Sequence, residues 1–114
     1  MFIKKNQTEK FSIDGGTNGY LYPNHPKGEQ TVAFVEMDGV YPLKGYSLND
    51  VCTETIFVVE GSLEVEIEGQ KEILKPGDMV MILPGNKYRV EGKGKSVDLI
   101  TPAWDKKQNH IIKD

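Results

Sequence analysis

Hydrophobic and polar residues alternate along the chain in short runs, and the clearest run lies at residues 62–69. There Leu63, Val65 and Ile67 alternate with three glutamates. Successive side chains of a β-strand point to opposite faces, so this run predicts a strand with one buried and one solvated face. Other strand-length runs are rich in Val, Ile, Phe, Tyr and Met, namely TVAFVEM, ETIFVVE, MVMIL, YRVE and SVDLIT.

Glycine and proline interrupt these runs so often that little room is left for helices. Gly69-Gln70 predicts a tight reversal after the clearest run, and the segment Lys75-Pro76-Gly77-Asp78 predicts another before the next apolar strand. The pattern is a meander of antiparallel strands. It favours an all-β sandwich or closed barrel, because closure removes the exposed strand edges that invite aggregation.

Length and composition fit a single domain. The chain has 114 residues, of which 38% are hydrophobic and 27% charged, and single domains typically have about 100–150 residues. We expect a barrel at residues 31–104 and a C-terminal tail at residues 105–114. Residues 1–30 alternate only weakly, so we expect an N-terminal arm that wraps the barrel or a partner subunit.

Charge and segment composition exclude several classes of partner. The net charge is −3 and the basic residues are scattered, so the chain lacks the dense basic stripe that binds nucleic acid. No run approaches the apolar length of a signal peptide or a membrane span, which predicts a cytoplasmic protein without a membrane partner. The single cysteine, Cys52, agrees with a reducing compartment and is expected to be a small buried hydrophobe.

Two segments resemble the signature motifs of one family. Glu54 to Gly61 matches the second half of the pattern G-x5-H-x-H-x3,4-E-x6-G, and Gly77 to Tyr88 follows the pattern G-x5-P-x-G-x2-H-x3-N. These are the two motifs of the cupin superfamily, and the chain resembles a small single-domain cupin. The resemblance implies an all-β, double-stranded β-helix, or jelly-roll barrel of antiparallel strands.

Three of the four metal-ligand positions of that family hold other residues. With the four-residue spacer, the two histidine positions of the first motif fall on Ser47 and Asn49, and the three-residue spacer restores no histidine. The histidine position of the second motif holds Tyr88. Glu54 alone keeps the identity of a ligand, so the resemblance implies a barrel that lacks the usual histidine ligands.

The resemblance also implies that Glu54 faces the barrel interior near Tyr88. A buried carboxylate must be paired, bound to a metal or protonated, and the Tyr88 hydroxyl can donate a hydrogen bond to it. Two interpretations stay open. The pair is either a satisfied polar contact of the core or, with Asn49, the lining of a pocket for a small polar or carbohydrate-like molecule.

Two aromatic residues complete the predicted ligand site. Tyr46 precedes the first motif, where the family places a loop at the barrel entrance, and an aromatic ring there can stack on a sugar. Trp104 lies in a stretch similar to the tail of a group of small bacterial and archaeal cupins, and it either caps the barrel mouth or packs in a dimer interface. Because the family commonly forms dimers, we expect a homodimer.

Three functions remain open at this point. The first is binding of a small-molecule ligand by Asn49, Glu54 and Tyr88 with no metal or other cofactor. The second is a cupin metalloenzyme of the isomerase or oxygenase type, in which a divalent metal is held by a depleted ligand set with Glu54 and His110 as its best candidates. The third is a metal-free isomerase or epimerase whose catalytic residues are Tyr88 as proton donor and Glu54 as base. A fold does not choose among them.

Overall fold

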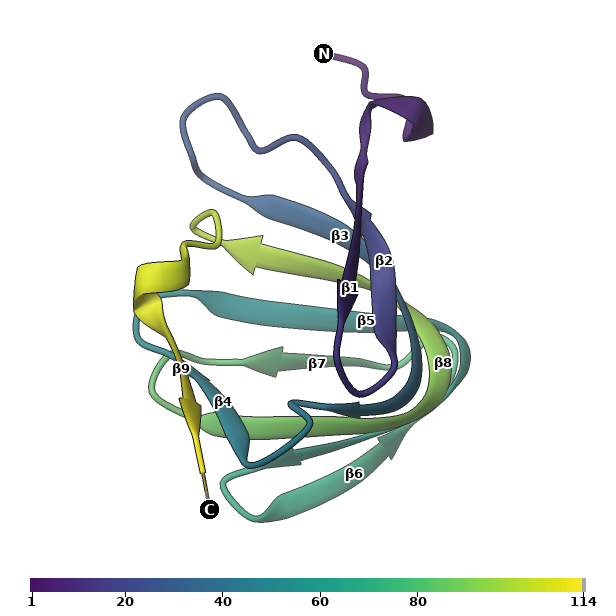
Figure 1. Ribbon diagram of the computed structural model, residues 1–114, viewed down its shortest axis with the longest axis vertical. Coiled ribbons are helices and arrows are strands. Elements are labelled where there is room, and N and C mark those ends of the chain that lie inside the picture. The colour runs from purple at the N-terminus through teal and green to yellow at the C-terminus, as the bar shows by residue number, and fades with distance from the viewer. Residues whose placement is uncertain (114) are drawn as a thin grey trace.

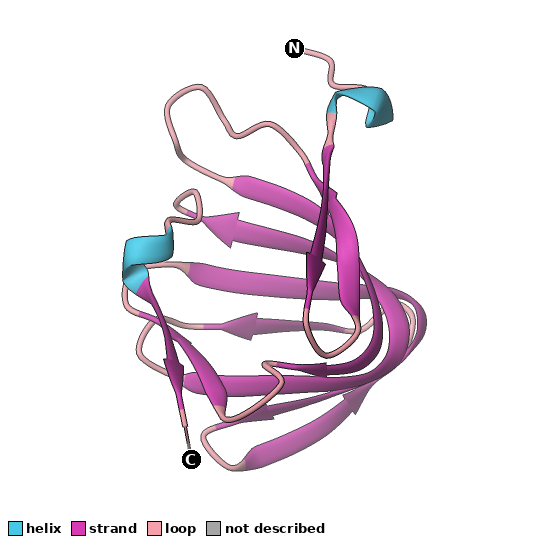
Figure 2. Cartoon of the chain, viewed as in Figure 1, coloured by secondary structure: helices cyan, strands magenta, loops and turns pink. Residues whose placement is uncertain are grey.

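The computed structural model describes residues 1–113, which form β-strands and two short 3-10 helices (Figures 1 and 2). The helices are η1 (Lys5–Gln7) and η2 (Lys106–Gln108). The strands are β1 (Glu9–Ile13), β2 (Thr17–Leu21), β3 (Thr31–Tyr41), β4 (Tyr46–Asn49), β5 (Thr53–Ile67), β6 (Gln70–Leu74), β7 (Met79–Ile82), β8 (Lys87–Thr101) and β9 (Asn109–Ile112). Every strand pairing is antiparallel. The predicted all-β barrel is confirmed, and no helix within residues 1–113 is long and apolar enough to cross a membrane.

The strands form two facing layers joined by long strands that bend from one layer into the other (Figure 1). The first half of β5 pairs with β7, whereas its second half pairs with β6. β8 pairs with β5 along nearly its whole length and with β3 from Val90 to Ile100, whereas its first two residues also pair with β4. The interior between the layers therefore receives side chains from both halves of β5 and β8.

Glycine makes the bend of β5 possible. A β-bulge lies between Val58 and Glu60, and Gly61 follows with a φ of 75°. A Cβ atom on Gly61 would lie 2.3 Å from the carbonyl oxygen of Lys93 on β8, closer than any side chain tolerates. The glycine that ends the first motif is thus required by the close approach of two strands at the corner of the barrel.

This corner explains one difference from the sequence pattern. ETIFVVE and SLEVEIE, which the sequence presents as separate runs, belong to one strand, and YRVE and SVDLIT likewise both lie in β8. The reversal after β5 is centred on Glu68 and Gly69, with φ values of 47° and 87°, one residue before the predicted position. Two consecutive residues with positive φ suit the tight hairpin that joins β5 to β6.

Apolar side chains fill the middle of the interior. The core consists of Met37, Ile56, Val58, Leu63, Val65, Ile82, Tyr88 and Val90. The alternation at residues 62–69 is reflected in β5, where Leu63 and Val65 are buried. The inward face of this strand therefore joins the core, as the pattern predicts.

Both end segments contain strands. Residues 9–21, expected as an arm, form a β1–β2 hairpin that extends the sheet beside β3. The inward positions of β2 are Thr17 and Gly19, which are buried but not hydrophobic, so the hairpin shows little alternation in the sequence. Within the expected tail, β9 pairs with β4. This pairing brings η2 and β9 to one end of the barrel.

Candidate functional site

Polar side chains replace apolar ones at the end of the interior nearest β4. We name Ser47, Asn49, Glu54, Tyr88 and Asp98 the polar cluster. They come from β4, the start of β5 and both ends of β8, and all face inward by strand alternation. Glu54 and Asp98 each retain 9% of their exposure, whereas Asn49 and Tyr88 retain 2%. Every member of the polar cluster is therefore largely removed from solvent.

The Tyr88 hydroxyl donates a hydrogen bond of 2.9 Å to Glu54 Oε1, as the sequence predicts. Burial raises the pKa of Glu54, while hydrogen bonding by Tyr88, then by the side chains of Asn49 and Asp98, lowers it. Burial, followed by the nearby charge of Glu54, raises the pKa of Tyr88 well above its ordinary value. The phenol therefore stays protonated and acts as a donor to the carboxylate.

Asp98 is a further inward neighbour of Glu54, and neither motif of the sequence marks it. In the register of β5 and β8, Asp98 pairs with Ile56, so Asp98 and Glu54 are diagonal neighbours on the inward face. Ser96 donates a 2.8 Å hydrogen bond to Asp98 Oδ1. Burial, then the charge of Glu54, raises the pKa of Asp98 well above its ordinary value. Each of these two buried carboxyl groups, when charged, therefore disfavours ionisation of the other.

Asn49 presents a hydrogen-bond donor to this pair. Its Oδ1 accepts hydrogen bonds of 2.9 Å from Gln108 Nε2 and from Asn109 Nδ2. Exchanging the oxygen and nitrogen of Asn49 would set its amide group against two donors, so these contacts fix its orientation. Asn49 Nδ2 has no hydrogen-bond partner in the described part of the chain. The side chain nevertheless lies near enough to Glu54 to lower the pKa of that carboxyl group.

Gln108 itself is held by the backbone. Its Oε1 accepts hydrogen bonds of 3.1 Å from the amide groups of Val51 and Cys52, and its side chain is 9% exposed. The segment after the barrel thus completes the polar cluster, which the sequence did not predict. The only signal for it was a pair of amide residues, Gln108 and Asn109, in a segment that otherwise reads as a charged tail.

Three predicted site residues do not join the polar cluster. Tyr46 alternates with Ser47 along β4 and so faces the outer side, where its hydroxyl donates to Glu66 Oε2 at 2.9 Å. Trp104 follows β8 and is 41% exposed. His110 Nε2 lies 2.6 Å from Asp50 Oδ2, and both side chains are more than half exposed. Asn49, Glu54 and Tyr88 are the predicted residues that the structure brings together.

Cys52 is buried, as predicted. Its thiol lies 3.3 Å from the carbonyl oxygen of Pro102, to which it can donate. Burial raises the pKa of this thiol, which lowers its reactivity at neutral pH.

The polar cluster does not fit the metal centre that the resemblance would supply. Within residues 1–113, no group of three or more His, Cys, Asp and Glu side chains is placed to hold a metal ion. Asn49, at a former histidine position, uses its oxygen as a double acceptor and turns its amide nitrogen, which is not a ligand for divalent metals, toward Glu54. The expected Glu54 and His110 pair is not assembled, because His110 is on the surface with Asp50.

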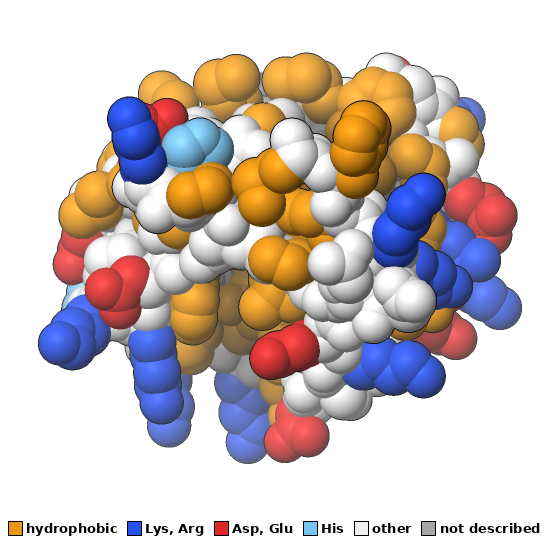
Figure 3. Space-filling view, turned by 90° about the horizontal axis from the view of Figure 1, so that it is seen from above, with side chains coloured by type: hydrophobic (Ala, Val, Ile, Leu, Met, Phe, Trp, Pro, Cys, Tyr) orange, Lys and Arg blue, Asp and Glu red, His pale blue; other side chains and the backbone are white. Residues whose placement is uncertain are grey.

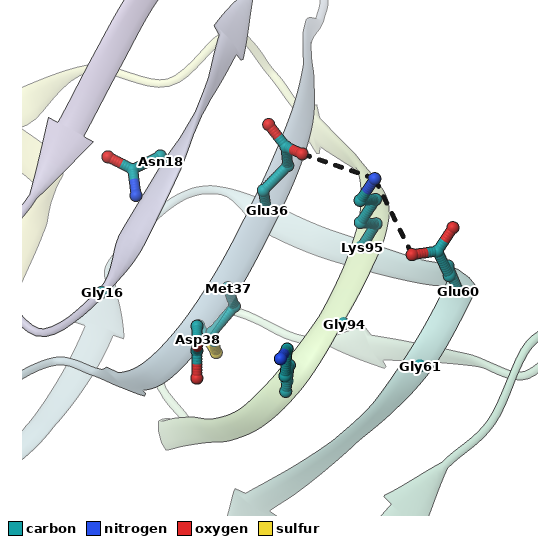
Figure 4. A pocket seen from close by; sticks show the side chains of 10 residues that line it. Gly16, Asn18, Glu36, Met37, Asp38, Glu60, Gly61, Gly94 and Lys95 are labelled. Carbon is teal, nitrogen blue, oxygen red and sulfur yellow. Dashed lines mark ion pairs between the residues drawn. The ribbon is translucent and has the colours of Figure 1, made fainter.

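Two hollows border the barrel. One, of about 350 Å³, is lined by residues of β5, β6 and β7, including Val65 and Ile67. Ile67 is the register partner of Tyr88, but no residue of the polar cluster lines this hollow. The other, of about 340 Å³, lies at the bend of the sheet, where Lys95 Nζ is 3.6 Å from Glu36 and 3.7 Å from Glu60 (Figure 4). Its ion pairs are half-exposed, so it is a charged surface hollow.

Comparison with known proteins identifies the fold. The family model described as Cupin domain matches residues 46–101. No curated protein sequence matches the chain significantly. Among solved structures, Pac13, described as a unique nucleoside dehydratase, matches with a TM-score of 0.88 and 16% identity over 99% of this chain and 91% of its own. Variants of this Streptomyces protein have been solved with uridine.

Two further structures are more similar in sequence but less similar in shape. KdgF from Halomonas sp. has a TM-score of 0.74 and 22% identity over 92% of this chain and 96% of its own. An RmlC-like cupin from Shewanella frigidimarina NCIMB 400 has a TM-score of 0.73 and 23% identity over 90% of each chain. At these identities the likeness establishes the fold and leaves the activity to be argued from the site.

Proposed function

This chain is a cupin-domain protein, and we propose that its polar cluster binds a small polar or carbohydrate-like molecule without a metal ion. One observation carries the proposal: the buried donor Asn49 Nδ2 makes no hydrogen bond of good geometry within residues 1–113, although its side chain lies beside the Glu54–Tyr88 pair. Folded proteins satisfy nearly all buried polar groups. A ligand oxygen that accepts a hydrogen bond from Asn49 Nδ2 would satisfy this donor.

The chemistry of the cluster suits a ligand that carries hydroxyl groups. Carboxyl oxygens of Glu54 and Asp98 can accept hydrogen bonds from hydroxyl groups, and Asn49 can donate one to an oxygen. Glu54 and Asp98 are buried, so a ligand that reaches them would be largely shielded from water. The uridine bound to the structurally similar Pac13 variants supports a ligand with a sugar-like part.

A binding experiment tests this proposal. Isothermal titration calorimetry and ligand-observed NMR would screen uridine, other nucleosides, monosaccharides and sugar acids against the protein. Glu54→Gln should weaken binding of any ligand found by about tenfold or more, since a hydrogen bond to a charged group contributes about 1.5–3 kcal/mol. Tyr46→Phe, on the outer side of β4, is the matched control and should leave binding unchanged. Metal analysis of the purified protein is the second measurement, and a stoichiometric metal ion would contradict the metal-free part of the proposal.

A second candidate is metal-free acid–base catalysis, which one observation favours. Glu54 and Asp98 are adjacent buried carboxyl groups whose pKa values are both raised, so one can serve as an acid while the other serves as a base. Tyr88 is a poor choice as the proton donor, because its hydroxyl group already donates to Glu54 and its pKa is raised. Asp98 is the better acid. Conversion of a bound compound by the wild-type protein, lost in both Glu54→Gln and Asp98→Asn, would support this candidate.

We also propose that the protein forms a homodimer through the outer side of β5 and β7. Exposed apolar side chains gather there, namely Phe57, Val59, Met79, Met81 and Leu83, each between 41% and 53% exposed. Phe57 and Met79 are register partners, so their side chains are adjacent. Hydrophobic side chains also line one long edge of the molecule seen from above (Figure 3). Light scattering after size-exclusion chromatography would show twice the chain mass, and a monomer mass would reject the dimer.

A further inference from the structure

We infer that the hollow bordered by β5, β6 and β7 binds a small organic amine, with the apolar body of the amine on the core and its ammonium group beside two carboxylates. The hollow has a volume of about 350 Å³, at the lower end of the range of small-molecule sites. No residue of the polar cluster lines it. The inference therefore goes beyond the proposed function and assigns a second binding site.

The strand pairing leaves this hollow open. Within residues 1–113, β6 and β7 each pair only with β5, β6 with its second half and β7 with its first half. The bend of β5 separates these two halves, so the two edge strands belong to different layers (Figure 1). Because β6 and β7 do not pair with each other, the barrel has an open side between them.

Apolar side chains of the core form the floor of the hollow. Val65 belongs to the core and is 3% exposed. Ile67, Leu74 and Val80 pack against the core but remain partly exposed, and all four residues line the hollow. An apolar group that fills the hollow would remove this surface from water, which favours binding.

Two carboxylates give the hollow its charge. Glu72 is the register partner of Val65 and alternates with Leu74 along β6, so its side chain lies on the inner side of this edge strand. Glu68 follows β5, and its Oε2 accepts a 2.7 Å hydrogen bond from the backbone amide of Lys87, which fixes the carboxylate in place. In the described part of the chain, no Lys, Arg or His side chain lines the hollow. The site therefore favours a cation over an anion.

NMR of methyl groups tests the site. The probe is 2-phenylethylamine, and N-(2-phenylethyl)acetamide and 3-phenylpropionate are its neutral and anionic analogues. The amine should shift the methyl signals of Val65, Ile67, Leu74 and Val80 with a Kd of about 1 mM, as expected for so small a ligand. The acetamide should bind about threefold more weakly and the anion about tenfold more weakly.

Charge-removing variants test the two carboxylates. Glu68→Gln and Glu72→Gln each keep an oxygen that can accept a hydrogen bond and remove one negative charge. Each should weaken binding of the amine about threefold and leave binding of the acetamide unchanged. Glu64→Gln is the matched control, because Glu64 lies on β5 beside Val65 but faces the opposite side and does not line the hollow. It should leave binding of the amine unchanged.

A larger side chain tests the apolar floor. Val80→Phe would fill the hollow from β7 and should weaken binding of the amine and of the acetamide by about tenfold or more, because both use the same floor. The melting temperature reports on folding of this variant. If Val80→Phe does not fold, the carboxylate variants decide the inference.

The other outcomes would overturn the inference. Absence of shifts at about ten times the expected Kd would leave Glu72 as an inward-pointing charge that protects an edge strand. Shifts centred on Ile56, the register partner of Asp98, would place the amine at the polar cluster instead. Equal affinity for the amine and the anion, or equal effects of Glu72→Gln and Glu64→Gln, would remove the role of the carboxylates. None of these results decides the proposed function, which the hydroxylated ligands test separately.

Discussion

Replacing Tyr88 by phenylalanine removes a single oxygen atom from the barrel interior. That oxygen lies 2.9 Å from Glu54 Oε1, and Tyr88 is 2% exposed. Water therefore has little access to the place it would leave. Glu54 would keep its burial, which raises its pKa, and would lose the first of the hydrogen bonds that lower it.

The expected loss follows from the charge of the acceptor. A hydrogen bond to a charged group contributes about 1.5–3 kcal/mol, and a buried carboxylate that loses its donor keeps its desolvation cost. We therefore expect Tyr88→Phe to lower the free energy of unfolding by about 2 kcal/mol at pH 8. For a domain of this size, roughly 4 °C per kcal/mol gives a melting temperature about 8 °C lower.

Urea unfolding at pH 8 measures this loss, and Tyr46→Phe is its matched control. The Tyr46 hydroxyl donates to Glu66 at the same distance, 2.9 Å, but on the outer side of β4, where water can solvate the carboxylate. The control should lose less than about 1 kcal/mol. In a Glu54→Gln background, the loss from Tyr88→Phe should fall to about 1 kcal/mol, because the acceptor is then neutral. Equal losses for the two tyrosine variants would refute the reasoning.

Three further predictions concern other buried groups. Asp98→Asn should become more stable relative to wild type as pH rises. In the wild type both carboxyl groups, Glu54 and Asp98, have raised pKa values in the folded state. Their stabilising contribution is therefore complete below the ordinary carboxyl pKa of about 4 and is lost as pH rises through the folded pKa values. Urea unfolding at pH 5, 7 and 9 measures this, and a difference independent of pH would contradict it. Thr17→Val should raise the free energy of unfolding by about 1 kcal/mol, since Thr17 Oγ1 is buried without a partner among residues 1–113; calorimetry showing a loss would count against it. Cys52 should react with a thiol reagent much more slowly in the folded than in the unfolded protein, and equal rates by absorbance would disprove its burial.

The fold could be predicted because local patterns and turn residues agree. The alternation of Leu63, Val65 and Ile67 marks an inward face that the structure reproduces. The continuity of β5 and β8 could not be predicted in the same way, since glycines in a sequence usually signal a break. Gly61 instead lies at the corner of the barrel, where the carbonyl oxygen of Lys93 on β8 leaves no room for a side chain. This close approach exists only after the strands have paired.

The site was predictable only where the motifs place residues at fixed positions. Asn49, Glu54 and Tyr88 occupy such positions and do meet in the interior. Asp98 and Gln108 reach them through strand pairing over long sequence distances. An aspartate in SVDLIT and a glutamine in a charged tail both resemble solvated residues when no partner is visible, so their roles depend on tertiary structure.

The Tyr46 prediction failed because the position of a residue in the sequence does not say to which side of a strand its side chain points. Tyr46 and Ser47 are adjacent in the chain, but alternate side chains of a strand face opposite sides. Ser47 is fully buried, so Tyr46 must face outward. A loop at the barrel entrance would have left its direction open, whereas β4 fixes it.

The pairing of β9 with β4 also affects when the site comes into existence during synthesis. The chain is made from its N-terminus, so the strands from β1 to β8 are all made before residues 105–112 appear. Until Gln108 and Asn109 arrive, nothing holds the amide group of Asn49 in its binding orientation. The proposed ligand site is therefore completed only when Gln108 and Asn109 have joined the strands made before them.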